Sequence, residues 1–195
     1  MKNLLLWSTF LSFLALHSGK VFAKSKKMPL ATNSIQVGLE TLSFQQDQQR
    51  IELQARTGIL NLSLMGPFRV KVKAWQTEPL AHKIETTSTD MDITQTDTYE
   101  GGFGGLELYN NIKRLKFSFA VGFQRTAIHQ RRLSESMSGM QKTQKRKLVD
   151  QGVAVMTSIE AHMKSLVFAF NAGASHREAA DRADAFGGFT IGFAY

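Results

Sequence analysis

The chain has 195 residues, and its 24 lysines and arginines outnumber its 16 aspartates and glutamates, which gives a formal net charge of +8. It contains no cysteine, so disulfide bonds and thiolate metal sites are excluded. The length suits a single domain.

Residues 1–23 have the three parts of a secretory signal peptide. Lys2 provides a positive start, residues 4–16 form an apolar run, and Val21, Phe22 and Ala23 precede the expected cleavage site. The apolar run is too short to span a bilayer as a helix, which argues against an uncleaved anchor. No cysteine follows it, so a lipid-anchored lipoprotein is excluded. We expect cleavage after Ala23 and a flexible periplasmic leader over residues 24–33.

From Ser34 onward, segments with a period of two recur along the chain. Residues 34–44 and 50–64 form the first two, and the second changes phase at Gly58, which suggests a β-bulge. The third begins at Phe68 and shows the clearest alternation, with Arg69, Lys71 and Lys73 between apolar residues. Such alternation places the two sets of side chains on opposite faces of a strand.

Five further strands are predicted in the rest of the chain. They cover residues 99–109, 115–125, 149–161, 165–175 and 186–195. The first of these changes phase at Gly104 and Gly105, whereas the others alternate throughout. No convincing long amphipathic helix interrupts them.

The connections between these strands alternate in length. Those at 65–67, 110–114 and 162–164 are short, whereas those at 78–98, 126–148 and 176–185 are long, and only the first outer loop, 45–49, is brief. An even number of strands with alternating short and long connections is typical of bacterial membrane barrels. The sequence predicts an all-β fold over residues 34–195, an eight-stranded antiparallel up-and-down transmembrane β-barrel.

The terminal strand carries a second sign of this architecture. Phe189, Ile191, Phe193 and Tyr195 occupy every second position, and the last residue of the chain is aromatic. This pattern resembles the terminal strand of small outer-membrane barrels of the OmpA/OmpX type. The resemblance implies that these four residues form the C-terminal assembly signal, which the outer-membrane assembly machinery reads.

A soluble eight-stranded barrel such as a lipocalin is the alternative, because it also alternates but turns its apolar residues inward. The other set on the terminal strand consists of Gly188, Thr190, Gly192 and Ala194. These residues are too small for a solvated surface and suit a crowded lumen. The membrane barrel is therefore favoured.

Inside such a barrel, the charged members of the alternating segments would face a lumen just wide enough for side chains to fill it. Buried charges must pair, so we expect a structural ion network; a gated ion path is the alternative, and a wide pore is disfavoured. The predicted network consists of Glu40, Glu52, Arg56, Arg69, Lys71, Lys73, Glu107, Lys116 and Glu160.

Two of the long loops differ in charge. The loop at 78–98 is acidic, whereas the loop at 126–148 is basic through Arg131, Arg132, Lys142, Lys145, Arg146 and Lys147. A basic external loop could bind lipopolysaccharide phosphates, or it could be solvated or pair with the acidic loop. Nucleic acid is not expected as a partner, because no aromatic residues lie among these cations.

Catalytic signals are weak. The histidines of the predicted mature chain are His82, His129, His162 and His176, and no two have metal-ligand spacing. Ser175 and His176 are adjacent on a strand and so point to opposite faces, which disfavours a hydrolytic triad. We predict no catalytic residue, no cofactor and no metal site.

These observations predict a monomeric integral barrel in the cell outer membrane of a Gram-negative bacterium. The preferred function is structural or surface-interacting, by adhesion or lipopolysaccharide contact, with membrane lipid, lipopolysaccharide and the assembly machinery as partners. The alternative, implied by the resemblance, is an enzyme that removes or adds acyl chains on lipid A.

Overall fold

The structure, a computed structural model, describes residues 33–46, 49–84, 91–136, 141–177 and 182–195. The predicted signal peptide and nearly all of the leader lie outside these residues. The strands are β1 (Ser34–Gln46), β2 (Gln49–Ser63), β3 (Phe68–Thr77), β4 (Leu80–Ile84), β5 (Met91–Ile112), β6 (Leu115–Ser136), β7 (Gln141–Met163), β8 (Leu166–Arg177) and β9 (Arg182–Ala194). In this part of the chain no helix is long and apolar enough to cross a membrane.

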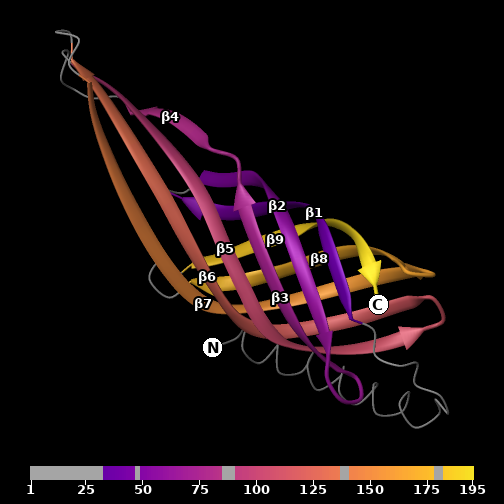
Figure 1. The fold of residues 1–195 in the computed structure, drawn as a ribbon. Helices are drawn as coiled ribbons and strands as arrows, with labels where there is room; N and C mark the ends of the chain where they lie inside the picture. The colour runs from indigo at the N-terminus through magenta and orange to yellow at the C-terminus, as the bar shows by residue number, and fades with distance from the viewer. Residues whose placement is uncertain (1–32, 47–48, 85–90, 137–140, 178–181) are drawn as a thin grey trace. The chain divides into compact units, whose positions relative to one another are not determined.

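Eight of the strands form a closed antiparallel barrel (Figure 1). Each strand pairs with its neighbours in sequence, except that β3 pairs directly with β5, and β9 returns to β1. The closing register runs from Ser34 opposite Ala194 to Ser43 opposite Ala185. Closure removes the unpaired edges that a sheet would otherwise expose. The all-β fold with eight up-and-down strands is confirmed.

At one end of the barrel the connections are tight turns. Gly66 adopts a positive φ of 63°, and Lys113 and Lys164 do the same at 57° and 58°. Each of these residues lies where the chain reverses between β2 and β3, β5 and β6, or β7 and β8. The left-handed conformation allows such short reversals, so this end of the barrel is compact.

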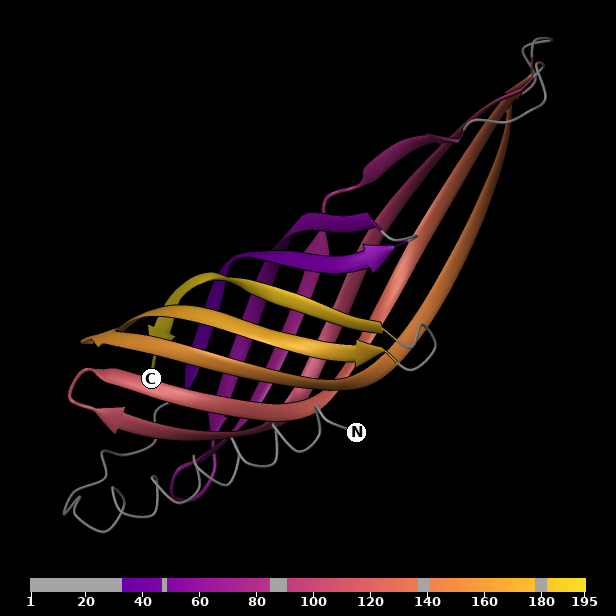
Figure 2. The ribbon, with the colours of Figure 1, turned by 180° about the vertical axis from the view of Figure 1, so that it is seen from behind.

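At the other end, three strands continue past the barrel wall. β5, β6 and β7 contain 22, 22 and 23 residues, and the register of β6 with β7 is unbroken from Leu115 opposite Ala161 to Glu135 opposite Gln141. We call the upper part of this sheet the projection: β4 with residues 91–98, 129–136 and 141–147. It is visible as the long arm in Figures 1 and 2.

The projection corrects the prediction of loops over residues 78–98 and 126–148. Most of the described residues in these segments are in strands, including β4, which pairs with β5. Residues 85–90 and 137–140 lie outside the described part. No alternation of apolar and polar residues is visible here, because both faces of the projection are polar. The backbone hydrogen bonds that define a strand do not depend on side-chain polarity.

The predicted phase changes in β2 and β5 are also wrong. Burial alternates without interruption, so Leu53, Ala55, Thr57, Ile59 and Asn61 all face inward on β2, with Gly58 outward. On β5 the inward set likewise runs through Phe103 and Glu107 without a break. What changes along these strands is the environment. The interior is apolar near the projection and polar near the tight turns.

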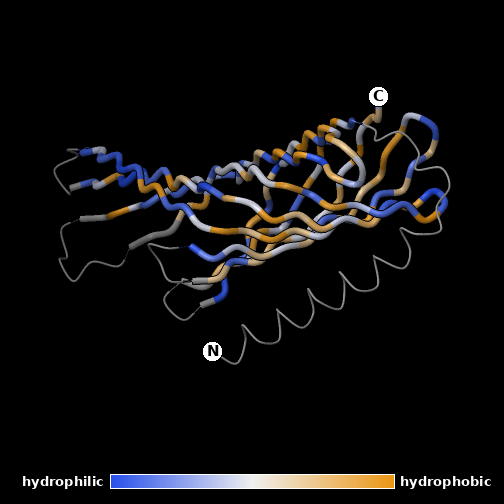
Figure 3. The backbone as a smooth tube through the Cα atoms, turned by 90° about the horizontal axis from the view of Figure 1, so that it is seen from below, coloured by the Kyte–Doolittle hydropathy of each residue, from blue (hydrophilic) through white to orange (hydrophobic). Residues whose placement is uncertain are grey.

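The outer wall shows the reverse arrangement. Near the tight turns it is covered by exposed apolar side chains from all eight barrel strands, which we call the apolar belt. Its exposed members include Ile35, Val37, Leu39, Leu62, Phe68, Val72, Leu106, Leu108, Phe117, Val121, Phe123, Val153, Ile159, Phe168, Phe170, Phe189, Ile191 and Phe193. Figure 3 shows the resulting alternation of hydrophobic and hydrophilic residues along the strands.

Candidate functional site

The lower lumen contains a buried ion cluster centred on Arg69. Its Nε donates to Glu107 Oε2 at 2.6 Å, and its Nη2 donates to Glu160 Oε1 at 2.8 Å. Lys71 Nζ lies 2.7 Å from Glu107 Oε1, and Lys116 Nζ lies 3.8 Å from Glu160 Oε2. These side chains are at most 5% exposed, so each charge depends on its partners for stabilisation.

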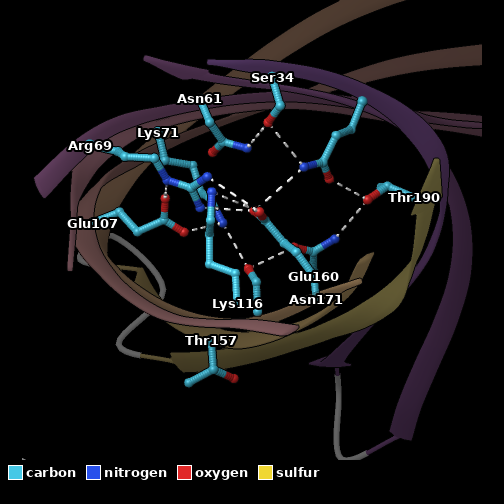
Figure 4. A network of polar contacts seen from close by, with 12 residues as sticks. Ser34, Asn61, Arg69, Lys71, Glu107, Lys116, Thr157, Glu160, Asn171 and Thr190 are labelled. Atoms are coloured by element: carbon cyan, nitrogen blue, oxygen red, sulfur yellow. Dashed lines mark hydrogen bonds and ion pairs between the residues drawn. The ribbon is translucent and has the colours of Figure 1, made fainter. Parts of the chain in front are cut away.

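Neutral side chains extend this cluster around the lumen. Lys71 Nζ donates to Ser158 Oγ at 2.7 Å, and Ser158 Oγ donates to Asn171 Oδ1 at 2.8 Å. Asn171 Nδ2 donates to Thr190 Oγ1, which donates to Gln36 Oε1 at 2.7 Å. The complete set, here called the lumen network, is Ser34, Gln36, Asn61, Arg69, Lys71, Glu107, Lys116, Ser158, Glu160, Asn171 and Thr190. Every strand of the barrel contributes to it (Figure 4).

Above the lumen network the interior is mainly apolar, although buried polar side chains such as Gln124, Thr126 and Ser175 lie beside the apolar ones. We call the following buried cluster the apolar plug: Leu42, Phe44, Leu53, Ala55, Trp75, Tyr99, Phe103, Ala120, Ala154, Met156 and Phe186. Lys73 lies on β3 between Lys71 of the network and Trp75 of the plug, and its Nζ pairs with Glu40 and lies 3.7 Å from the centre of the Phe186 ring. A cavity among the plug residues has a volume of about 20 Å³, which is room for one water molecule. This filled interior leaves no wide pore along the described part of the lumen.

Seven residues of the predicted charge network are buried in the lumen: Glu40, Arg69, Lys71, Lys73, Glu107, Lys116 and Glu160. The prediction was wrong for Glu52 and Arg56. Their side chains are 56% and 80% exposed, and they pair outside the barrel with Arg50 and Glu78, respectively. The false phase change at Gly58 caused the error, since it assigned the wrong face to the first half of β2.

Apart from the placement of Thr190 in the lumen, the neutral members of the lumen network were not predicted from the sequence. Gln36, Ser158, Asn171 and Thr190 are buried and link strands that lie far apart in the chain. On β1, β7, β8 and β9 these residues occupy the alternate positions whose side chains point into the barrel, and this could be seen in the sequence. Only the closure of the barrel, however, shows which neutral side chains come within hydrogen-bonding distance.

The predicted basic loop is part of the projection. Arg131 and Arg132 lie on β6, whereas Lys142, Lys145, Arg146 and Lys147 lie on β7, and all six are exposed. Alternation divides them between two faces. One face carries Arg131, Lys145 and Lys147, and the other carries the remaining three. These cations are therefore held by a β-sheet at fixed spacing.

Arg131 lies directly opposite Lys145 across the β6–β7 ladder. On the other side of Arg131 the aligned residue of β5 is Thr96, which has no charge. Like charges in directly opposed positions destabilise a sheet, so an anion that bound between Arg131 and Lys145 would relieve their repulsion. The pair is thus a candidate anion-binding site.

At the base of the projection, acid and base are already paired. His129 Nε2 lies 2.7 Å from Glu100 Oε1, and Lys147 Nζ lies 3.7 Å from the same oxygen. Glu100 is above the apolar belt and about two-fifths exposed. The hydrogen bond with His129 lowers the pKa of Glu100 below its ordinary value of 4.5. The positive charge of Lys147 is therefore balanced by the nearby Glu100 carboxylate to a greater extent than the charges of Arg131 and Lys145 are by any described acid.

The histidines that the structure describes lie on four different strands, β4, β6, β7 and β8. Ser175 is buried and accepts a hydrogen bond from Gln124, whereas the adjacent His176 is exposed on the opposite face of β8. His162 lies 3.1 Å from Glu160, and His82 lies on β4. Among the described residues, no group of three or more histidine or acidic side chains could hold a metal ion.

Neither a protein-family model nor a curated protein sequence matches this chain. Among solved structures, it is similar to Ail, the attachment invasion locus protein of Yersinia pestis, in complex with the heparin analogue sucrose octasulfate. That match has a TM-score of 0.59 at 12% identity, and it covers 85% of this chain and 100% of Ail. A second Ail structure gives a TM-score of 0.57 at 12% identity over 84% of this chain and 98% of that one.

The N-terminal β-barrel domain of Pseudomonas aeruginosa OprF is also similar, with a TM-score of 0.45 at 10% identity, covering 83% of this chain and 97% of that domain. Both Ail structures match more than four-fifths of this chain and nearly all of Ail. The chain therefore has the fold of the small eight-stranded outer-membrane β-barrels.

Proposed function

We propose that this protein is an integral outer-membrane barrel that acts in surface adhesion, by binding a sulfated or phosphorylated saccharide on its basic projection. The distribution of side chains supports the membrane location. Soluble monomers rarely expose an apolar surface as continuous as the apolar belt, and a polar lumen is the reverse of a lipocalin interior. The fold shared with Ail agrees with this location.

The observation that carries the adhesion proposal is the opposed pair Arg131 and Lys145. Sulfate and phosphate groups are well matched to arginine, which can donate two parallel hydrogen bonds to them. Strand geometry separates neighbouring cations by about 5 Å across the ladder and about 7 Å along it. A saccharide with several anionic groups can therefore contact more than one of these cations at once. That Ail was solved with a heparin analogue makes this ligand class a natural choice.

Binding of sucrose octasulfate to the refolded barrel in detergent tests the proposal. We expect the Arg131→Gln/Lys145→Gln double variant to raise the Kd at least about tenfold, since each charged hydrogen bond lost corresponds to roughly 1.4 kcal/mol or more. Arg114→Gln/Lys164→Gln is the matched control, because both residues are exposed at the tight-turn end and the charge change is identical. An equal loss in both variants would show that net charge alone attracts the ligand and would overturn the proposal.

A further inference from the structure

The outer wall of the barrel has an open groove where the apolar belt meets the base of the projection. Its volume is about 1640 Å³, larger than many ligand pockets. The groove is lined by residues from β1, β2, β3, β5, β6, β7 and β9. We call it the wall groove.

The floor of the wall groove is made of small residues aligned across neighbouring strands. Gly58 lies opposite Ala74, Ala74 lies opposite Gly102, and Gly104 follows on β5. A Cβ atom added at Gly58 or Gly104 would meet no atom within 4 Å, so both positions face open space. The wall is thin here, whereas Val37 and Phe123 beside it are 61% and 77% exposed. An apolar chain can therefore lie against the backbone between larger side chains.

Cations border the same groove on the side of the projection. Arg125 is the next residue in the aligned row after Gly102, and Arg56 and Lys147 also line the groove. Arg56 and Lys147 each have an acidic partner, at 3.4 Å and 3.7 Å. The exposed Arg125 forms no ion pair with any residue that the structure describes. It is thus available to a ligand at the end of the apolar floor.

We propose that the wall groove binds a phosphorylated, multiply acylated lipid with the chemistry of lipid A, with an acyl chain on the glycine and alanine floor and a phosphate on Arg125. The proposal rests on the proposed membrane location and not on saccharide binding. A second copy of the chain fits less well, because a two-fold interface would bring the Arg56, Arg125 and Lys147 side chains of both copies together. Charge complementarity therefore favours an anionic lipid.

Native mass spectrometry of the full barrel in phosphatidylcholine nanodiscs containing lipid A tests this proposal. We expect the wild type to retain lipid A in preference to its dephosphorylated form. Arg125→Gln should lower that retention about tenfold, and Gly58→Leu/Gly104→Leu should lower it similarly by filling the floor. Gly187→Leu is the control for filling, since Gly187 also faces outward with room for a Cβ, 3.6 Å from Asn171 O, but lies outside the groove.

Three results would overturn the proposal: unchanged retention in the filled variant, equal retention of the dephosphorylated lipid, or a wild-type dimer that the filled variant dissociates. Heat-modifiable gel mobility reports whether each variant is folded, and Gly104→Ala replaces the double variant if that one fails to fold. Sucrose octasulfate binding should be the same in the filled variant and the wild type. Loss of lipid binding and loss of saccharide binding are thereby distinguished.

Discussion

Arg69 lies between two glutamates that come from different strands, and its charge has no access to water. Glu107 also pairs with Lys71, so this one carboxylate neutralises two buried cations. The desolvation cost of such groups is recovered only while the partners are in place. The cluster therefore makes the native arrangement of β3, β5 and β7 strongly preferred over any arrangement that separates these residues.

Glu107→Ala should lower the free energy of unfolding by about 3–5 kcal/mol, because it leaves buried cations without one of their partners. Urea unfolding of the barrel in lipid vesicles, followed by heat-modifiable gel mobility, measures this change. Glu52→Ala is the control, since Glu52 is exposed and its pair with Arg50 is worth at most about 1 kcal/mol. Similar losses in the two variants would contradict the assignment of these residues to the inside and outside of the barrel.

At the scale of an element, β9 closes the barrel and presents Phe189, Ile191 and Phe193 outward. Tyr195 follows the strand, is 69% exposed, and donates its backbone N–H to Asn33 O at 3.0 Å. Its ring contributes little packing. If Tyr195 matters to the protein, its importance must come from recognition during assembly.

Tyr195→Asp should reduce the membrane-inserted yield in cells far more than Lys145→Asp does. A charge at the interface costs only about 0–1 kcal/mol, which is too little to unfold a barrel. The purified variant should accordingly refold in vitro almost as well as the wild type. Comparison of inserted yield in cells with refolded yield in vitro checks the prediction, and an unchanged yield in cells would contradict it.

At the scale of the whole molecule, an outward apolar belt and a filled interior lead us to expect a barrel that is anchored in lipid and conducts poorly. We expect the protein to fractionate with the outer membrane, to show heat-modifiable mobility, and to give no steady conductance in planar bilayers. A soluble periplasmic protein, or a stable open channel, would contradict this expectation. Phe103→Ala serves as a check on the plug, because it removes a large side chain that is 3% exposed.

Together with the lengths of the connections and the pattern of the terminal strand, alternation in the sequence predicted the strands of the barrel wall, their order and their closure. It could not show which face is interior, because that depends on height relative to the apolar belt. Leu53 and Ala55 are apolar and inward, whereas Leu60 and Leu62 are apolar and outward, so the same residue type indicates opposite faces on one strand. The projection was missed for a related reason, since Arg131 and Arg132 on consecutive positions leave no apolar face to detect.

The unbroken register of β6 and β7 has a consequence for how far the projection can reach. Removal of two residues from each of β5, β6 and β7 at the base of the projection, below the cations, would keep every remaining side chain on its present face. Removal of one from each would exchange the two faces of all residues above the deletion. The length of the arm can therefore change during evolution only in steps of about 7 Å, if its pattern of cations is to survive.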